Sequence, residues 1–338
     1  MPAGVALGHW DVYELLHRAR TGEDRPLATV ILPGLQQGGV RTVLFAVGGD
    51  SQSHASGSDH PQRGTLVSMD VAQRALDDTP GVHLVTDRAT LRADDRDSIG
   101  FLYVLEGGRP LEGSIEALRQ FYRLGVRCML LTWNGRNELG DGVGEGPTAG
   151  GLSRFGREVV HEMRRLGMLL DLSHLSERGF YDAIAAYDGV VTATHSNAKA
   201  LHDHPRNLTD DQIEAVAATG GVIGIAFMPA FLSDGQPTVD TVVDHIDHVA
   251  SLVGAQHVAI GPDFSYGPVA AKHKEQRRYE GIKVDLDVRY PIADATELPV
   301  LVDALSRRGV ADADIRAIMG ANLHRVLAAV LPERTLPA

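Results

Sequence analysis

Cysteine is almost absent from this sequence, and long apolar runs are missing. Cys128 is the only cysteine among the 338 residues, which excludes an intrachain disulfide. No apolar run reaches the roughly 18 residues that a membrane-spanning helix requires. The N-terminal residues lack a basic start followed by an apolar core, so we expect no secretory signal. These absences predict a soluble protein of the cytoplasm that contacts no membrane.

Basic charge is also in short supply. The chain has 32 lysine and arginine residues against 44 aspartate and glutamate residues, a formal net charge of −12. A nucleic-acid surface needs a basic stripe, so we expect no nucleic-acid partner. The composition, 43% hydrophobic and 22% charged, is that of an ordinary globular protein. The length allows two domains, but α/β barrels of this size are common as one, so we expect residues 1–338 to form a single domain.

Eight short apolar runs with β-like composition are spread along the chain. They are Val5–Leu7, Val40–Val47, Phe101–Leu105, Val126–Thr132, Met168–Leu172, Val190–Ala193, Val222–Phe227 and Val258–Ile260. Helices are expected at Ser114–Leu124, Ser153–Leu166, Asp210–Ala218, Val239–Val253, Leu298–Arg308 and Ile315–Leu327. This alternation predicts an α/β fold, a (β/α)8 TIM barrel. A doubly wound open sheet is the alternative, but the even spread of polar strand ends favours closure.

Two polar stretches are expected to be loop insertions in the barrel. Residues 48–64 follow the second strand and are rich in Gly, Ser and Asp. Residues 266–290 are long and charged and follow the last strand, where they would cover the site.

Two histidines follow neighbouring strands. The run Met168–Leu172 leads into His174, and the run Val190–Ala193 leads into His195. The segment between them has a helical pattern, so the whole stretch is one βαβ unit. The carboxyl ends of parallel strands converge on the face where ligands bind. Both imidazoles are therefore expected to point into one site.

Polar side chains follow most of the other strands as well. The residues at or just past the strand ends are His9, Asp11, Glu106, Trp133, Asn134, His174, His195 and Asp263. Imidazoles and carboxylates at one barrel mouth indicate a metal site, and this many suit two ions about 3.5–4 Å apart with a shared carboxylate. Many binuclear barrel hydrolases use a carbamylated lysine as the bridge, but none of the four lysines follows a strand. Glu106 is therefore the natural bridge.

Charge balance points to a separate group that binds the substrate. Two divalent ions would be roughly neutralised by the carboxylates of the site and a bridging hydroxide, which leaves no positive charge over. Arg206, in the loop beyond His195, would hold a carboxylate through two parallel hydrogen bonds.

These residues lie in motifs that occur in one known family in the same order. The motifs are Gly8-His9-Trp10-Asp11, Leu105-Glu106-Gly107, Gly151-Leu152-Ser153-Arg154-Phe155-Gly156, Asp171-Leu172-Ser173-His174, Thr194-His195-Ser196, His204-Pro205-Arg206-Asn207-Leu208, Gly261-Pro262-Asp263-Phe264 and Gly320-Ala321-Asn322-Leu323. Through them the chain resembles the renal (membrane) dipeptidase family, zinc peptidase family M19, among the amidohydrolase-like barrels. The resemblance spans nearly the whole chain and implies a bacterial-type soluble member with two zinc ions per chain. Relatives tend to be homodimers, which is the expectation here.

The resemblance also implies roles for the residues of the site. One zinc ion would be held by His9, Asp11 and Glu106, and the other by Glu106, His174 and His195. Asp263 would act as a catalytic group beside the bridging water and the leaving amine, and Arg206 would bind the terminal carboxylate of the substrate.

The chain departs from the family pattern near the expected pocket. The best-known members have a histidine after Leu-Thr in the fourth strand, where this chain has Trp133. We expect Trp133 to form a pocket wall, and Asn134 or a zinc ion to stabilise the oxyanion. Trp10 and Ser265 also differ from the usual residues, so the substrate stays open.

The implied function is hydrolysis of a dipeptide, or a dipeptide-like amide with a free C-terminal carboxylate, by hydroxide held between the metal ions. One alternative is the same chemistry on a specialised amide or Cys-Gly conjugate in a biosynthetic pathway. The other is a barrel that binds a metabolite without catalysis.

Overall fold

The computed structural model describes residues 4–50, 60–92, 98–264, 282 and 288–334. The strands in this part of the chain are β1 Val5–Asp11, β2 Val40–Gly49, β3 Val82–Leu84, β4 Ile99–Glu106, β5 Val126–Leu130, β6 Leu169–Asp171, β7 Val191–Ala193, β8 Val222–Ile225 and β9 Val258–Ile260. The α-helices are α1 Tyr13–Arg20, α2 Leu32–Gln37, α4 Pro61–Asp77, α5 Arg88–Leu91, α6 Ile115–Arg123, α7 Arg154–Leu166, α8 Glu177–Tyr187, α9 Asp210–Ala218, α10 Pro229–Leu232, α11 Val239–Val253, α13 Leu298–Arg307, α14 Asp312–Arg316 and α15 Asn322–Val330.

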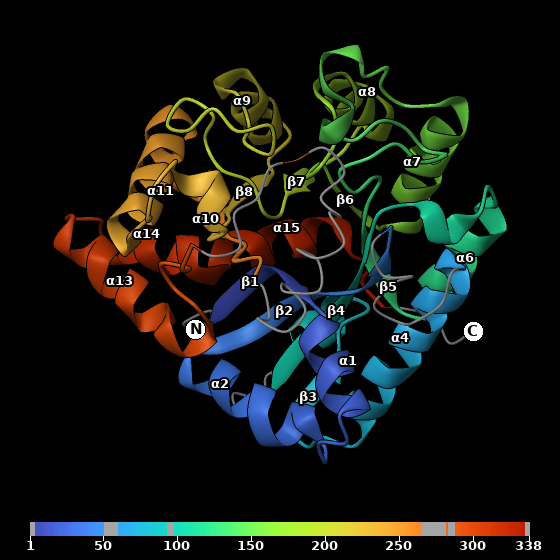
Figure 1. The fold of residues 1–338 in the computed structure, drawn as a ribbon, viewed down its shortest axis with the longest axis horizontal. Helices are drawn as coiled ribbons and strands as arrows, with labels where there is room; N and C mark the ends of the chain where they lie inside the picture. The colour runs from blue at the N-terminus through green and yellow to red at the C-terminus, as the bar shows by residue number, and fades with distance from the viewer. Residues whose placement is uncertain (1–3, 51–59, 93–97, 265–281, 283–287, 335–338) are drawn as a thin grey trace.

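The strands close into a parallel barrel. The sheet order is β2-β1-β9-β8-β7-β6-β5-β4-β3, and an additional pairing of β2 with β4 closes a ring of eight strands. The ninth strand, β3, lies outside the ring and pairs only with the first residues of β4. Helices surround the ring, with α1, α2 and α4 on one side and α7, α8 and α9 on the other (Figure 1). The predicted TIM barrel and all eight expected strands are confirmed.

Alternation along the strands produces two apolar layers. Leu44 and Ala46 of β2 belong to the cluster inside the barrel. Val43 and Phe45 of the same strand belong to the larger cluster between the strands and the helices. Since successive side chains of a strand point to opposite faces, this parity also decides which residues at the strand ends face the interior.

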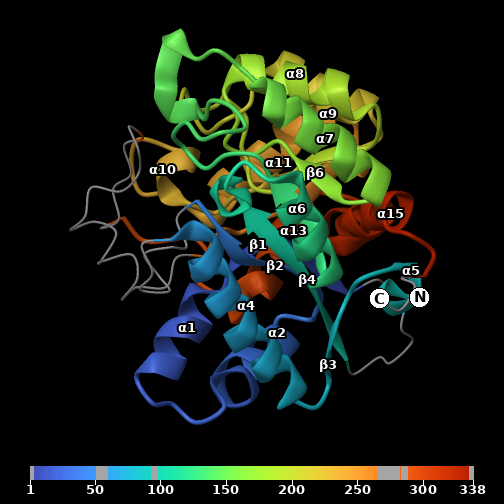
Figure 2. The same ribbon diagram turned by 90° about the vertical axis from the view of Figure 1, so that its right-hand side faces the viewer.

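Helix α15 closes the barrel interior at the end opposite to the carboxyl ends of the strands. Leu323, Val326 and Leu327 of this helix belong to the barrel-interior cluster. The side-chain amide of Asn322 donates to the carbonyls of Ala255 and Val258, each at 2.8 Å, and so fixes the start of the helix beside β9. Figure 2 shows α15 on the side of the barrel away from α10. The opposite end, where the strands terminate, is left for the site.

The expected helices are present, and side chains cap the start of several of them. Ser153 and Thr209 are N-caps whose side chains accept from Gly156 N and Gln212 N. Gly167 follows α7 in the left-handed conformation, at φ 73°. The expected helix Ile315–Leu327 is divided by a π-helical turn at Ala317–Ala321.

The prediction of a loop at residues 48–64 is wrong at both ends. β2 continues to Gly49 and α4 begins at Pro61, while residues 51–59 lie outside the described residues. Of the second predicted insertion, residues 266–281 and 283–287 also lie outside the described part. That residues 1–338 form one domain stays a prediction.

Candidate metal centre

Glu106 is the last residue of β4 and continues a row of side chains that face the barrel interior. Leu102 and Val104 precede it in that row. Its carboxylate is buried, and three imidazoles surround it. The distances from its Oε1 to the Nε2 atoms are 3.3 Å for His174, 3.6 Å for His9 and 3.7 Å for His195. The structure thus brings the expected bridge and the three expected histidines together.

Asp11 and Asp263 lie on the His9 side of the site. Asp11 Oδ1 is 3.8 Å from His9 Nε2. His9, Asp11 and Asp263 offer ligand atoms that all lie within 4.8 Å of one another, and so do His9, Glu106 and His195. Because the two groups share His9, they form one continuous cluster with the chemistry of a metal site.

Hydrogen bonds define which ring nitrogens face the centre. Asn134 Oδ1 lies 2.8 Å from His174 Nδ1, and an amide oxygen only accepts, so this Nδ1 carries the proton. Thr194 Oγ1 lies 2.9 Å from His195 Nδ1 and donates its own proton to the carboxylate of Asp171, so His195 Nδ1 also donates. Burial lowers the pKa of both imidazoles and so favours the neutral rings. In neutral rings with the proton on Nδ1 the two Nε2 atoms are unprotonated, yet they lie only 2.9 Å apart.

His9 is fully buried, and within the described part of the chain neither of its ring nitrogens has a hydrogen-bond partner. A buried polar atom without a partner is costly and calls for an explanation such as an ion. His174 and Asp263 show a second kind of cost, since their backbones adopt left-handed conformations at φ 71° and 53°. Non-glycine residues are uncommon in this conformation, and strained residues tend to cluster at functional sites.

Crowded carboxylates and burial shift the pKa values of the site. Burial alone would lower the pKa of His9, but the carboxylates of Glu106 and Asp11 raise it to about 10. Burial raises the pKa of Glu106 and of Asp263. Burial lowers the pKa of His174, and the Arg206 guanidinium acts in the same direction. A divalent cation would relieve this pattern, because it favours ionised carboxylates and takes the place of the proton on His9.

Arg206 reaches the centre from the loop beyond β7. Its guanidinium lies 5.3 Å from the centre of the Phe231 ring, and Nη2 donates to the carbonyl of His195 at 3.2 Å. The side chain is buried, and none of the residues that the structure describes hydrogen-bonds to its Nε. Burial lowers its pKa to about 10, although Asp263 and Glu106 act against this. A buried guanidinium with donor capacity to spare suits an anionic ligand.

Trp133 and Asn134 lie beside His174. The Trp133 and His174 rings are 6.1 Å apart between centroids, so the indole borders the centre. Its role as a pocket wall stays a prediction. Asn134, which we expected to contact substrate, instead uses its amide oxygen to orient His174. Its role in substrate binding stays a prediction.

Three contributing residues were not identified from the sequence. Asp50 is buried at the end of β2 and accepts from Arg109 N at 2.8 Å, Trp133 N at 3.1 Å and Asn137 Nδ2 at 2.9 Å. Burial raises its pKa to about 6, although the N–H groups of Arg109 and Trp133 act against this. It joins the loops after β4 and β5. The sequence feature that could have revealed Asp50 is its position at a strand end, directly after a pair of glycines.

The other two missed residues are Asp171 and Thr194. Thr194 hydrogen-bonds to His195, and Asp171 hydrogen-bonds to Thr194. In the sequence both residues appeared only as members of motifs.

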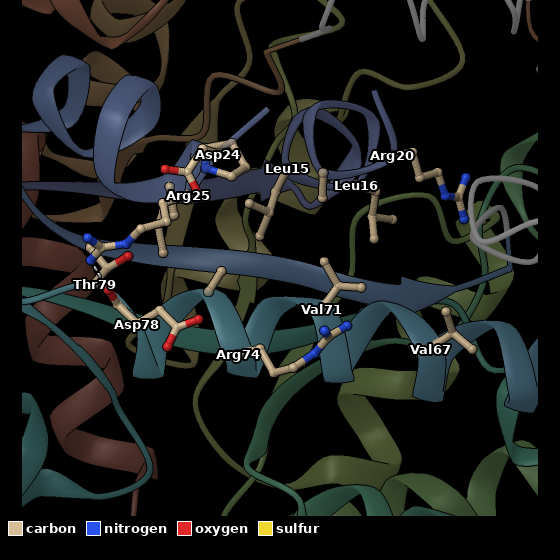
Figure 3. A pocket seen from close by; sticks show the side chains of 14 residues that line it. Leu15, Leu16, Arg20, Asp24, Arg25, Val67, Val71, Arg74, Asp78 and Thr79 are labelled. Carbon is tan, nitrogen blue, oxygen red and sulfur yellow. Dashed lines mark hydrogen bonds between the residues drawn. The ribbon is translucent and has the colours of Figure 1, made fainter. Parts of the chain in front are cut away.

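A pocket of about 420 Å³ lies elsewhere, between α1 and α4 on the outside of the barrel (Figure 3). Leu15, Leu16 and Arg20 line it from α1, and Val71 and Arg74 line it from α4 on the facing side. None of the candidate site residues lines it.

The sequence pattern described as "Membrane dipeptidase (Peptidase family M19)" matches residues 5–334. The chain belongs to this family. An uncharacterized dipeptidase of Schizosaccharomyces pombe is 35% identical over 268 residues, which cover 78% of this chain and 61% of the yeast protein. Dipeptidase tcpJ of Claviceps purpurea is 34% identical over 290 residues, which cover 82% of this chain and 61% of the fungal protein. The chain thus spans about three fifths of the length of these relatives.

A solved member of similar fold is a metallo peptidase from Rhodobacter sphaeroides, determined with a phosphinate mimic of the dipeptide L-Ala-D-Ala. It superposes with a TM-score of 0.82 at 25% identity, over 97% of this chain and 99% of that chain. The likeness confirms the predicted resemblance to the M19 family and its barrel. Across the described residues of this M19 member, no helix combines the length and apolar character that a bilayer crossing requires.

Proposed function

We propose that this M19 member is a metal-dependent dipeptidase whose metal ions are held by His9, Asp11, Glu106, His174 and His195. The observation that carries the proposal is the approach of two unprotonated Nε2 atoms, of His174 and His195, to 2.9 Å. Two lone pairs repel at this distance unless a cation lies beside both. The unpartnered nitrogens of His9 support the same conclusion from the other side of Glu106.

We propose two zinc ions as the cofactor. Imidazole nitrogens with carboxylate oxygens, and no thiolate, suit zinc in a catalytic site. Three histidines and two carboxylates exceed the needs of one ion, and Glu106, which lies between the histidines, is placed to be shared. When bound, such a pair supplies a water nucleophile at neutral pH and polarises a carbonyl group.

The protein's own residues supply binding and proton transfer. Arg206 holds the free carboxylate of the substrate, which restricts the enzyme to short substrates with a free C-terminus. Asp263 takes the proton from the attacking water and passes it to the departing amine. Burial raises the pKa of Asp263 and so brings it toward the range in which a carboxylate both accepts and returns a proton. Trp133 closes one wall of the pocket.

The substrate class that fits these groups is a dipeptide or a dipeptide-like amide. The ligand of the Rhodobacter sphaeroides relative, a mimic of L-Ala-D-Ala, supports the inclusion of substrates with a D-residue at the C-terminus. A specialised amide or Cys-Gly conjugate is the second candidate, because Trp133 gives the pocket a bulky apolar wall beside His174.

A combined metal and substrate assay tests the proposal. Protein reloaded with zinc and freed of excess ions should contain two zinc ions per chain and cleave members of a panel of L,L and L,D dipeptides. A chain that retains no metal would contradict the metal centre. Two ions with cleavage of a Cys-Gly conjugate alone would favour the specialised substrate, and two ions with no cleavage would favour a binding barrel.

A further inference from the structure

Asp171 lies beneath the two turns that carry His174 and His195. Leu169 packs inside the barrel, so Asp171, two residues further along β6, faces the same interior, and it is fully buried. Its Oδ1 accepts from Ser173 N and from Thr194 N, each at 3.0 Å. Its Oδ2 accepts the hydroxyl of Thr194. Asp171 therefore ties the end of β6 to the end of β7.

Thr194 extends this contact to His195. Its single hydroxyl proton goes to Asp171, because a carboxylate can only accept, and its oxygen then accepts the Nδ1–H of His195 at 2.9 Å. The chain of hydrogen bonds leaves His195 Nε2 unprotonated and facing Glu106. His174 has a different support, the neutral amide of Asn134.

The choice of a carboxylate at this position needs an explanation beyond packing. Within the described part of the chain, Asp171 makes no ion pair, and its partners are two backbone N–H groups and one hydroxyl. The Arg206 guanidinium feels the charge of Asp171 without contacting it. A buried charge whose hydrogen-bond partners are all neutral is costly, and an amide or apolar side chain would fill the space at lower cost. The negative charge of Asp171 becomes favourable if a cation binds to His195 on the side away from Thr194.

We propose that Asp171 and Thr194 are positioning residues that hold His195 in the Nδ1–H tautomer, so that Nε2 is free to bind a metal ion. This role rests on the proposed metal centre and deepens it. A carboxylate often supports a metal-ligating histidine directly, and here the threonine hydroxyl lies between the two.

The relay predicts a specific defect for Asp171→Asn. The amide oxygen still accepts from Ser173 N and Thr194 N, but the amide nitrogen now donates to Thr194 Oγ1. The hydroxyl must then donate to His195 Nδ1, which moves the imidazole proton to Nε2 and blocks the ligand atom. We expect zinc affinity to fall about 100-fold, the upper end of the range for such outer partners.

Thr194→Val breaks the relay without reversing it. His195 then loses its partner but is free to adopt the Nδ1–H tautomer on metal binding, so zinc affinity should fall only about 10-fold. Thr194→Ser keeps the hydroxyl and should remain within about threefold of the parent protein. Thr192→Val is the matched control. It removes a buried hydroxyl two residues before Thr194, and this hydroxyl donates to the carbonyl of Val222 instead.

The double variant Asp171→Asn/Thr194→Val provides the sharpest test. Without the hydroxyl, the amide cannot impose the wrong tautomer, so the double variant should bind zinc about 10-fold more weakly than the parent protein, as Thr194→Val does. Two independent structural defects would instead multiply to about 1,000-fold. Competitive zinc titration against a chelator measures the parent protein and the five variants.

Nitrogen-15 spectra of the metal-free protein report the tautomer of each imidazole and depend neither on metal nor on activity. The His195 signals are assigned as those that disappear in His195→Gln. The parent protein should show His195 as Nδ1–H, and Asp171→Asn should show it as Nε2–H. The same tautomer in both, or a multiplied loss in the double variant, would overturn the relay.

If the parent protein binds no zinc, the metal centre fails while these spectra still decide the relay. If Asp171→Asn does not fold, equal zinc affinities of Thr194→Val and Thr194→Ser would overturn it.

Discussion

The Nε2 atoms of His174 and His195 lie 2.9 Å apart, and each ring uses its Nδ1 as a donor to a fixed oxygen. The two nitrogens come from consecutive strand ends that the parallel barrel places side by side. Glu106 Oε1 lies within 3.7 Å of both. This arrangement of lone pairs and a carboxylate, without a proton between the rings, is the basis of the proposed metal centre.

Replacement of His174 by alanine should remove one of the two metal ions. His174 Nε2 lies 3.3 Å from Glu106 Oε1 and 2.9 Å from His195 Nε2, whereas Asp11 and Asp263 group with His9. The zinc content should therefore fall from two ions to one per chain, with loss of dipeptide cleavage, as measured by elemental analysis. His248→Ala is the control, because His248 pairs with Asp210 outside the site. A His174→Ala protein with two zinc ions would contradict the assignment.

Asp263→Asn should separate metal binding from turnover. The amide cannot take up a proton from water, so kcat should fall by about 10²- to 10⁴-fold, the usual contribution of a general acid–base group. Zinc content should stay at two ions, because the remaining ligands are intact. An unchanged kcat would remove Asp263 from the mechanism, and a parallel loss of zinc would make it a ligand instead.

Arg206→Met should abolish the preference for a free C-terminus. Hydrogen bonds to charged groups contribute about 1.5–3 kcal/mol, so kcat/KM for a dipeptide should fall roughly 10- to 100-fold. The same dipeptide with an amidated C-terminus has no carboxylate to lose and should be cleaved equally by both proteins. The ratio of the two kcat/KM values is the measurement. A ratio that does not change on substitution would show that Arg206 serves packing against Phe231.

Asn134→Ala should weaken metal binding and leave substrate binding unchanged. Its amide oxygen fixes the Nδ1–H tautomer of His174, so its loss should weaken zinc binding by about 10-fold. With zinc in excess, KM for a dipeptide should stay near that of the parent protein. A raised KM with unchanged zinc affinity would restore the role in substrate binding that the sequence suggested.

Asp50 should make the parent protein less stable as pH rises. Burial raises the pKa of Asp50 from 3.8 to about 6, so the folded state binds the proton more tightly than the unfolded state. The contribution of this group to the free energy of unfolding is therefore highest below about pH 4, falls between about pH 4 and 6, and is lower by about 3 kcal/mol above that range. Urea unfolding of the parent protein and Asp50→Asn across this pH range should show their difference change in this direction. A constant difference would show that the Asp50 pKa is not raised.

The sequence was sufficient for the barrel and for the residues at strand ends. Glu106, His174 and His195 each follow an apolar run, and the geometry of a parallel barrel brings such ends together whatever lies between them. The same reasoning could not reveal Asn134 as the partner of His174, because that contact joins side chains 40 residues apart and depends on loop conformation.

Missed elements have physical reasons too. The first buried residues of α4 are Gly64, Thr65 and Ser68, which are small or polar, and the buried apolar residues Met69, Ala72 and Leu76 follow only in its second part. Gly48 allows this close packing, since a Cβ there would meet the Thr65 side chain at 2.2 Å. β3 has three half-buried residues and is too short for a pattern to show.

Anomalous X-ray scattering at the zinc edge from crystals of the zinc-loaded protein tests the central claim most directly. The account predicts two peaks on either side of Glu106, one within bonding distance of His174 and His195 and the other of His9 and Asp11. A map with no peak at Glu106, or with zinc bound only elsewhere on the protein, would contradict it.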